Sequence, residues 1–173
     1  YTLTPPPVKV FAEENGIPVF QPKSMRDGEA LEILKRLNPE LNVVTAYGKI
    51  LPPEILYLPK FCSINIHASL LPKYRGAAPI QWCILNGEKE TGVTSMLMNE
   101  GLDTGDILIS EKLPIDENMT AGELHDKLSL LGADVLSKTI RALLDDSLKP
   151  IKQNDDESCY SPMLTKALCP IDF

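Results

Sequence analysis

Three polar residues, Asn65, His67 and Asp103, have the types and positions that chemistry would need. Side chains alternate along a strand, so Asn65 and His67, two residues apart, point to the same face. Asp103 lies in a loop between two expected strands, from which a carboxylate could reach His67. An amide can donate to the oxyanion of a tetrahedral intermediate, an imidazole can stabilise it or move protons, and a carboxylate can hold the imidazole. The three residues are therefore predicted to catalyse acyl transfer to an amine.

Each of these residues also has an ordinary structural interpretation. Asn65 could pin a loop, and His67 could satisfy a buried carbonyl. Asp103 could cap the turn that it forms with Thr104 and Gly105. A central parallel strand is normally apolar on both faces, and buried amide and imidazole groups cost free energy unless they find partners. The position favours function, but the residue pattern alone leaves both interpretations open.

Other chemistries fit the sequence less well. Ser69 lacks the Gly-x-Ser-x-Gly elbow of serine hydrolases. No metal site is predicted, because the only other histidine, His125, lies far along the chain on an expected helix, where a surface or packing role is typical. The cysteines form no Cys-x-x-Cys pair, and free thiols in a reducing compartment are expected. These cysteines are Cys62, Cys83, Cys159 and Cys169.

Strand and helix signals alternate around the polar residues. Strands are expected over residues 17–20, 41–47, 62–66, 91–98 and 106–113, and helices over 8–14, 27–38, 79–86 and 120–143. Thr120 and Glu123 fit a capping box at the start of the last helix. This order predicts an α/β fold with a mostly parallel sheet and helices on both faces, in which ligands bind at the carboxyl ends of strands. His67 lies at such an end.

Length and charge limit the possible organisation. A chain of 173 residues with 43% hydrophobic residues suits one domain, and a polar, irregular sequence begins after Asp145. We expect a catalytic domain over residues 1–145 and a linker over 146–173. The net charge of -7 argues against a surface that grips nucleic acid through many phosphates. No membrane-spanning run or signal layout is found, so a soluble, cytoplasmic protein is expected.

The run from Asn65 to Gly76, Asn-Ile-His-Ala-Ser-Leu-Leu-Pro-Lys-Tyr-Arg-Gly, closely resembles the signature of the 10-formyltetrahydrofolate-dependent formyltransferases. Asp103 follows His67 by 36 residues, the spacing associated with that family. The resemblance implies a Rossmann-like formyltransferase domain in which Asn65, His67 and Asp103 match the catalytic residues. It also implies a folate site lined by Ser69, Leu70, Leu71 and Pro72, and by the backbone around Tyr47, Gly48, Ile50 and Leu51.

Within the family, the segments 75–82, 86–88 and 101–106 are most similar to members that formylate initiator methionyl-tRNA, a step of translation initiation. The resemblance implies 10-formyltetrahydrofolate as co-substrate, with no metal, membrane or obligate protein partner. It also implies that tRNA is held mainly by segments absent here, namely a basic loop whose tail resembles Leu3–Lys9 and a C-terminal β-barrel. We expect a chain truncated at both ends, from a bacterium or, alternatively, an organelle.

Two alternative functions remain open. The first is formyl transfer to another amine, either an amino sugar nucleotide or glycinamide ribonucleotide. The second is a domain that binds folate without transfer, or that hydrolyses formyltetrahydrofolate. The Arg75–Pro79 segment favours the tRNA substrate over the other two amines.

Overall fold

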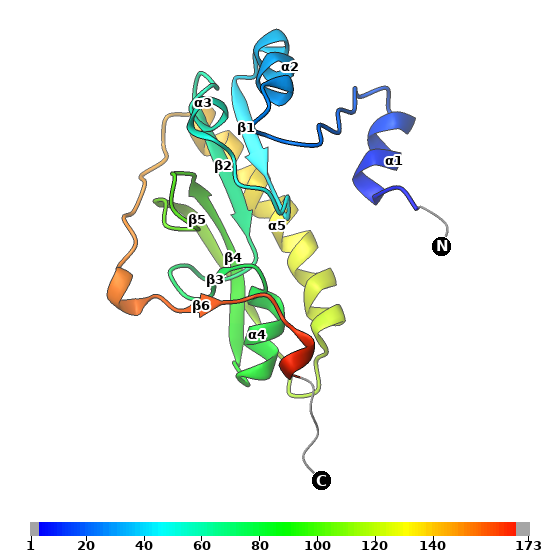
Figure 1. The fold of residues 1–173 in the computed structure, drawn as a ribbon. Helices are drawn as coiled ribbons and strands as arrows, with labels where there is room; N and C mark the ends of the chain where they lie inside the picture. Colours follow the sequence, from blue (N-terminus) through cyan, green and yellow to red (C-terminus); the bar gives the residue numbers. More distant parts are fainter. Residues whose placement is uncertain (1–3, 169–173) are drawn as a thin grey trace.

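The computed structural model describes residues 4–168, and its centre is a mixed four-stranded sheet (Figure 1). The strand order is β1 (Leu41–Val44), β2 (Cys62–His67), β4 (Glu90–Leu97) and β5 (Ile107–Pro114). The pairing of β1 with β2 is parallel, and the pairings of β2 with β4 and of β4 with β5 are antiparallel. The α/β class is confirmed, but the expectation of a mostly parallel sheet is wrong for the described strands.

The chain reaches β4 through residues 68–89, which include helix α4 (Pro79–Leu85). This connection is long enough for a crossover to a parallel strand, so its length does not set the direction of β4. The register shows that direction: Thr94 lies opposite His67 and Leu97 opposite Ile64, so β4 begins beyond the end of β2 and runs back along it. β4 and β5 then form a hairpin through the loop of residues 98–106.

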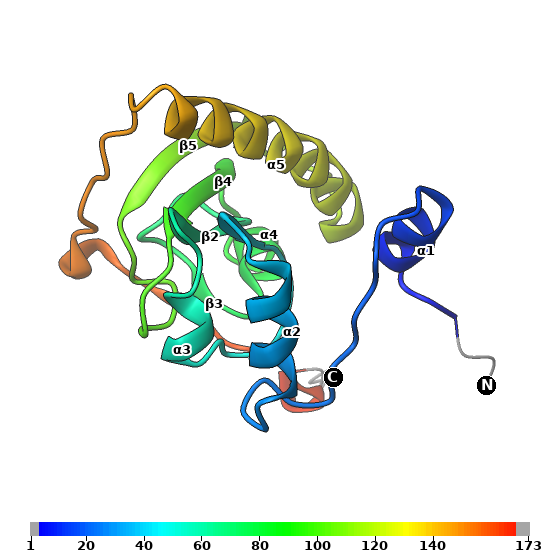
Figure 2. The ribbon, with the colours of Figure 1, turned by 90° about the horizontal axis from the view of Figure 1, so that it is seen from above.

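Helices cover both faces of the sheet, as predicted (Figure 2). Helix α5 (Ala121–Leu144) lies along one face, and α2 (Glu29–Leu37) and α3 (Pro53–Leu56) lie on the other. The alternation along β2 matches this arrangement: Ile66 packs against Gly132 of α5, whereas the Ser63 hydroxyl donates to the Leu56 carbonyl of α3 at 2.6 Å. Asn65 and His67 therefore share the α3 side of the strand.

Two clusters of buried residues hold the layers together. One joins α4 and α5 to the sheet and comprises Tyr74, Cys83, Val93, Ile115, Met119, Leu124, Leu128 and Val135. The other lies beneath α2 and α3 and comprises Ala30, Leu51, Ile55 and Leu56. The predicted capping box begins α5, because Thr120 and Glu123 bond each other's backbone N–H groups.

The predicted helices agree with α1 (Pro7–Glu14), α2, α4 and α5, whereas α3 was not expected. The predicted strand at 17–20 is wrong: Ile17 and Phe20 are exposed and have no strand beside them, and Pro18 has no N–H to donate. The strand predicted over 41–47 ends at Val44, because the backbone enters the left-handed region at Ala46.

The segment after α5 stays on the domain. Strand β6 (Tyr160–Ser161) pairs in parallel with β3 (Arg75–Gly76), and short 3-10 helices occupy Asp155–Glu157 and Lys166–Leu168. In Figure 1 this orange and red segment passes beside β3, while α1 stands apart from the sheet. The boundary near residue 145 stays a prediction, but the segment predicted as a linker packs against the loop after β2. Leu3 and Cys169, named above, lie outside the described residues.

Candidate active site

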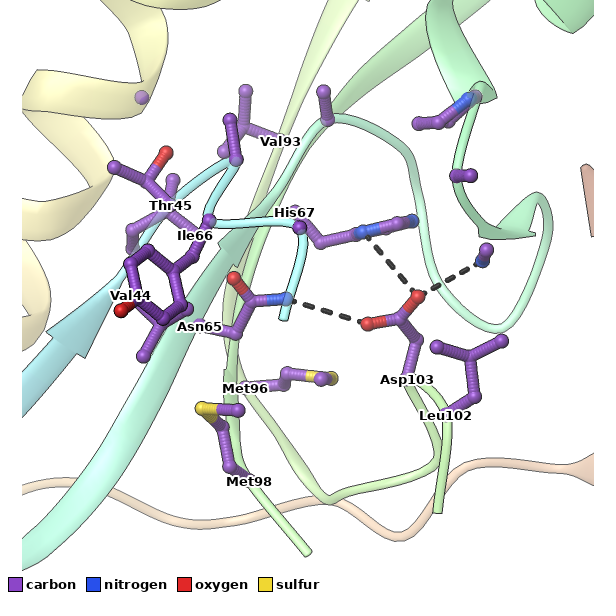
Figure 3. Close-up of a pocket in the computed structure, with 18 of the residues that line it drawn as sticks. Val44, Thr45, Asn65, Ile66, His67, Val93, Met96, Met98, Leu102 and Asp103 are labelled. Carbon is purple, nitrogen blue, oxygen red and sulfur yellow. Dashed lines mark hydrogen bonds and ion pairs between the residues drawn. The ribbon is translucent and has the colours of Figure 1, made fainter. Parts of the chain in front are cut away.

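The three predicted catalytic residues meet at the carboxyl end of β2 (Figure 3). The Asn65 amide Nδ2 donates to Asp103 Oδ1 at 3.3 Å, and Asp103 Oδ2 lies 3.8 Å from His67 Nδ1. His67 is 6% exposed and Asp103 9% exposed, so both are held where water screens charge weakly. β2 supplies the amide and the imidazole, and the β4–β5 loop supplies the carboxylate.

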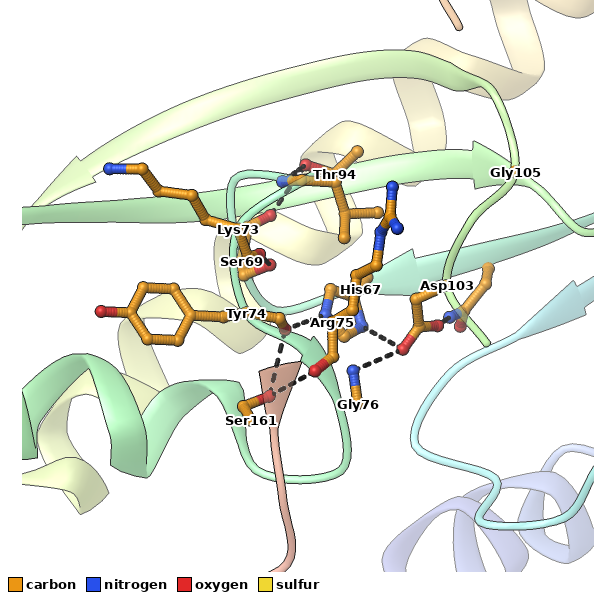
Figure 4. Close-up of polar contacts among 12 residues, drawn as sticks. His67, Ser69, Lys73, Tyr74, Arg75, Gly76, Thr94, Asp103, Gly105 and Ser161 are labelled. Carbon is orange, nitrogen blue, oxygen red and sulfur yellow. Dashed lines mark hydrogen bonds and ion pairs between the residues drawn. The ribbon is translucent and has the colours of Figure 1, made fainter. Parts of the chain in front are cut away.

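The two ring nitrogens of His67 face different partners (Figure 4). His67 Nε2 lies 2.9 Å from the Tyr74 carbonyl oxygen. Because a carbonyl only accepts, Nε2 carries a proton and donates it. In the neutral ring, Nδ1 is then the basic nitrogen, and it faces Asp103. The interpretation of His67 as the partner of a buried carbonyl is correct for Nε2, while Nδ1 remains available for chemistry.

Asp103 is held by backbone from another part of the chain. Its Oδ2 accepts from the Gly76 N–H at 2.8 Å, and its own backbone has a φ of 52°, in the left-handed region. The neighbouring turn is fastened differently, since the Thr104 hydroxyl donates to Asn99 Oδ1 at 2.9 Å. The carboxylate thus bonds Asn65 and Gly76, which argues against the turn-cap interpretation.

The loop after β2 is fixed by its own side chains. The Ser69 hydroxyl is fully buried and donates to the Lys73 carbonyl at 2.7 Å. The Thr94 hydroxyl of β4 donates to the Ser69 carbonyl at 2.7 Å and accepts from the Leu71 N–H at 3.2 Å. The Ser69 hydroxyl therefore shapes the loop.

Tyr74, whose carbonyl accepts the hydrogen bond from His67 Nε2, is itself held by hydrogen bonds of its side chain. Its phenol donates to Glu88 Oε1 at 2.6 Å and accepts from the Asn86 amide at 3.0 Å. Burial, together with the bond to Glu88, raises the pKa of Tyr74 to about 12. Tyr74 has a φ of 58°, so the phenol holds a backbone that would otherwise avoid this conformation.

A cavity of about 890 Å³ opens beside the three polar residues, a volume typical of small-molecule sites. Its lining includes Asn65, His67 and Asp103 and is largely apolar elsewhere. Four of the residues expected at the folate site also line it, namely Tyr47, Gly48, Ile50 and Leu51. The other four do not, namely Ser69, Leu70, Leu71 and Pro72. A ligand-binding role for either group stays a prediction.

His125 is exposed on α5, as expected, and pairs with Asp126 at 3.1 Å. It also lies at the rim of the cavity, which the sequence did not indicate. Within residues 4–168, no group of three or more His, Cys, Asp or Glu residues could hold a metal ion. In the same range, no helix has both the length and the apolar character that crossing a membrane requires.

The sequence model of the family described as "Formyl transferase" matches residues 2–140. This chain belongs to the formyl transferase family. Its formyltransferase domain resembles the structure of an N-formyltransferase from Helicobacter canadensis in complex with folinic acid and dTDP-3-aminofucose. The two are 29% identical with a TM-score of 0.70, and the match covers 88% of this chain and 53% of that one. It also resembles phosphoribosylglycinamide formyltransferase from Bacillus halodurans, at 29% identity and a TM-score of 0.71. This match covers 79% of this chain and 74% of that one.

Among curated proteins, this formyltransferase chain is 56% identical to methionyl-tRNA formyltransferase of Caldanaerobacter subterraneus, over 96% of this chain and 54% of that protein. It is 54% identical to the enzyme of the same name from Geobacter metallireducens, over 99% of this chain and 55% of that protein. The chain thus spans about half the length of these relatives.

Sequence reasoning missed several residues that hold the candidate site together. Gly76 supplies an N–H to Asp103, Tyr74 supplies the carbonyl for His67, and the Ser161 hydroxyl also donates to that carbonyl at 3.1 Å. All three act through backbone groups or from a segment read as a linker. Gly76 was the one available signal in the sequence, because a glycine often stands where the backbone needs a conformation that other residues avoid.

Proposed function

We propose that this chain is the formyl-transferring part of an enzyme that moves the formyl group of 10-formyltetrahydrofolate to the amino group of initiator methionyl-tRNA. The observation that carries the proposal is the 56% identity to a methionyl-tRNA formyltransferase, against 29% to formyltransferases that act on a sugar or on glycinamide ribonucleotide. Because the named relatives are bacterial, we expect the enzyme to act in the bacterial cytoplasm at the start of protein synthesis.

Asn65 would stabilise the oxygen of the formyl group. As the amine nitrogen adds to the formyl carbon, the carbonyl electron pair moves to this oxygen and leaves it negative. A side-chain amide has two donor hydrogens, and one of those on Asn65 is directed at Asp103. The second can donate to the oxyanion, an interaction that strengthens as charge develops.

His67 would move the proton. The amine must lose a proton after it adds, and the folate nitrogen must gain one as its bond to the formyl carbon breaks. Nδ1 of His67 is the nitrogen available for this transfer, because the Tyr74 carbonyl engages Nε2. Once Nδ1 is protonated, the Asp103 carboxylate at 3.8 Å stabilises the imidazolium.

The residues of the cavity fit a folate donor. A folate supplies the activated formyl group together with a flat, largely aromatic body, and an apolar cavity with a few polar groups at one end suits such a molecule. Tyr47, Gly48, Ile50 and Leu51 would border the body of the donor, and Asn65 and His67 would face the formyl group.

The test offers the full-length protein and donor labelled in the formyl carbon to three acceptors, and includes a reaction without acceptor. The acceptors are initiator methionyl-tRNA, an amino sugar nucleotide and glycinamide ribonucleotide. Label should enter methionyl-tRNA, with a kcat/KM far above that for the others. Label in another amine would show that this amine, and not methionyl-tRNA, is the acceptor. Free formate formed equally with and without acceptor would instead indicate a hydrolase.

A further inference from the structure

Gln153 is a buried amide in the segment that the sequence indicated as a linker. It is 7% exposed. Its Nε2 donates to the Asp103 carbonyl at 2.9 Å and to the Gly105 carbonyl at 2.7 Å. Its Oε1 accepts from Arg75 Nε at 3.0 Å and from Arg75 Nη2 at 2.8 Å. Both donor hydrogens and both acceptor lone pairs of the amide are therefore used.

These four bonds join the two backbone segments that set the position of the Asp103 carboxylate. One is the β4–β5 loop, which carries Asp103 itself. The other is β3, where Arg75 precedes the Gly76 N–H that donates to Asp103 Oδ2. Gln153 is 48 residues or more from each of its partners along the chain, so the link is tertiary and not a local turn.

The loop needs such a link, because its conformation is not one that the backbone favours. Asp103 has a φ of 52°, in a region that residues other than glycine seldom enter. Such a conformation persists only where the surroundings impose it. The side chain of Asn99 ties the loop to itself, by accepting from Gly101 and Thr104. Gln153 ties the Asp103 and Gly105 carbonyls to a different part of the domain.

We infer that Gln153 is a positioning residue for the reaction: it holds the β4–β5 loop against β3 so that the Asp103 carboxylate stays beside His67 Nδ1. The expected loss of kcat rests on the proposed formyl transfer, whereas the expected displacement of the Asp103 carboxylate does not. The four hydrogen bonds of Gln153 go to the Arg75 side chain and to the carbonyls of Asp103 and Gly105, so it acts through Asp103.

The variant Gln153→Glu keeps the size of the side chain and an acceptor for Arg75, but it cannot donate to the two carbonyls. In the full-length protein, kcat for formyl transfer should fall about 10- to 100-fold, since a misplacement near 1 Å can cost about 100-fold. KM for the folate donor should change by less than about threefold. The matched control is Asp155→Asn, which removes the charge from the other partner of Arg75, an ion pair at 2.8 Å on the surface. It should change kcat by less than about twofold.

A double-mutant cycle separates positioning from general support of the fold. If Gln153 acts through the carboxylate, Gln153→Glu should cost less than about threefold in kcat when Asp103 is already Ala. An equal loss of kcat in both backgrounds would overturn the inference. If Gln153→Glu unfolds the protein, Gln153→Met, which places no charge beneath the carbonyls, takes its place in the same cycle.

A readout without substrate keeps this test distinct from that of the proposed function. The Asn65 side-chain amide donates to Asp103, so its NMR resonances report where the carboxylate lies. They should shift in Gln153→Glu and stay in place in Asp155→Asn. Unchanged Asn65 resonances in Gln153→Glu would refute the positioning role. Shifted resonances in a protein that transfers no formyl group would uphold that role and refute the proposed function alone.

Discussion

At the scale of single residues, the division between the two nitrogens of His67 explains the geometry of the site. A ring whose Nε2 were free could present either nitrogen to a substrate, in either tautomer. The Tyr74 carbonyl removes this choice, because it can only accept a hydrogen bond and therefore requires the proton to be on Nε2. Nε2 therefore orients the ring, and Nδ1, beside Asp103, is the nitrogen that we propose exchanges protons.

Replacing Asn65 by alanine should remove the donor to the oxyanion. We expect kcat of the full-length enzyme to fall about 100- to 1,000-fold, as at other sites that lose one such donor. Single-turnover measurements of formyl transfer would test this, with thermal unfolding to confirm that the variant is folded. A loss of less than about tenfold in a folded variant would refute the role of Asn65.

Asp103→Asn should keep the shape of the side chain but remove the charge beside Nδ1. The new amide oxygen can accept from Gly76 or from Asn65 but not from both, so one bond is also lost. We expect kcat to fall about 100-fold or more, by analogy with other acid–base groups, and folate binding to change less. Stopped-flow kinetics and donor titration would measure the two effects. A parallel collapse of folding and activity would instead favour a structural role in the turn.

At the scale of elements, the loop from Ala68 to Ala78 connects the site to the rest of the domain. It carries the Tyr74 carbonyl and the Gly76 N–H, which hold His67 and Asp103 respectively. β6 lies directly against it, and a Cβ at Gly76 would collide with the Tyr160 ring and the Ser161 carbonyl. A small change in this loop should therefore affect His67 and Asp103, the two residues proposed to be catalytic, together.

Gly76→Ala tests this coupling. Gly76 has a φ of 110°, so alanine would be strained there and would also push β6 away. We expect a loss of more than about 1 kcal/mol in the free energy of unfolding, together with reduced kcat. Gly87→Ala is the matched control, since Gly87 also has a positive φ, of 64°, but has open space around it. Equal effects in the two variants would mean that strain alone, and not contact with β6, explains the result.

The anchoring of Tyr74 predicts a dependence of stability on alkaline pH. Burial and Glu88 raise its folded-state pKa to about 12, from about 10 in an unfolded chain. The folded state then binds this proton more tightly, so the contribution is fully present below about pH 10 and is lost as pH rises towards about 12. Denaturant midpoints of wild type and Tyr74→Phe should therefore converge over this range. Tyr57→Phe, at an exposed tyrosine, is the control, and a constant difference between wild type and Tyr74→Phe would contradict the prediction.

Sequence reasoning succeeded where the signal was local. The alternation along β2 placed Asn65 and His67 on one face, and the capping box located the start of α5. It failed where the signal was tertiary. The direction of β4 is set by its pairing with β2, which no local pattern gives, and Gln153 gains its contacts only because its segment returns to β3. A polar residue in an irregular segment carries no periodicity from which such a return can be read.

At the scale of the whole molecule, the site joins residues that are distant in the chain. β2, the β4–β5 loop, the loop after β2 and the segment around Gln153 all reach one end of the sheet. The parallel pairing of β1 with β2 brings the loop after β1 to the cavity at the carboxyl end of β2. The β4–β5 loop leaves the sheet beside Ser63, near the start of β2, and folds back so that Asp103 reaches Asn65. Helix α5 covers the face of the sheet opposite to α2 and α3.

The charge of the chain bears on how an RNA substrate would be held. With 24 acidic and 17 basic residues, the chain carries a net charge of -7, whereas binding to nucleic acid draws most of its affinity from Lys and Arg at phosphates. The methionyl-tRNA formyltransferase of Caldanaerobacter subterraneus matches this chain over about half of its own length, so comparing the tRNA affinities of the two proteins shows what the rest of the relative adds. We expect the 173-residue chain to bind tRNA at least about tenfold more weakly than the relative in low salt.

The salt dependence of the tRNA affinity shows whether a difference in the number of phosphate contacts explains the weaker binding. Each phosphate contact releases a counterion and steepens the fall of log affinity with log salt, by about 0.7 to 0.9 per contact. If the 173 residues supply few phosphate contacts, their slope should be shallow while that of the relative is steep. Titrating initiator tRNA into both proteins at several salt concentrations measures the two slopes. Equal slopes and equal affinities would place the phosphate contacts within this acidic chain, which would require its 17 basic residues to gather on one surface near the site.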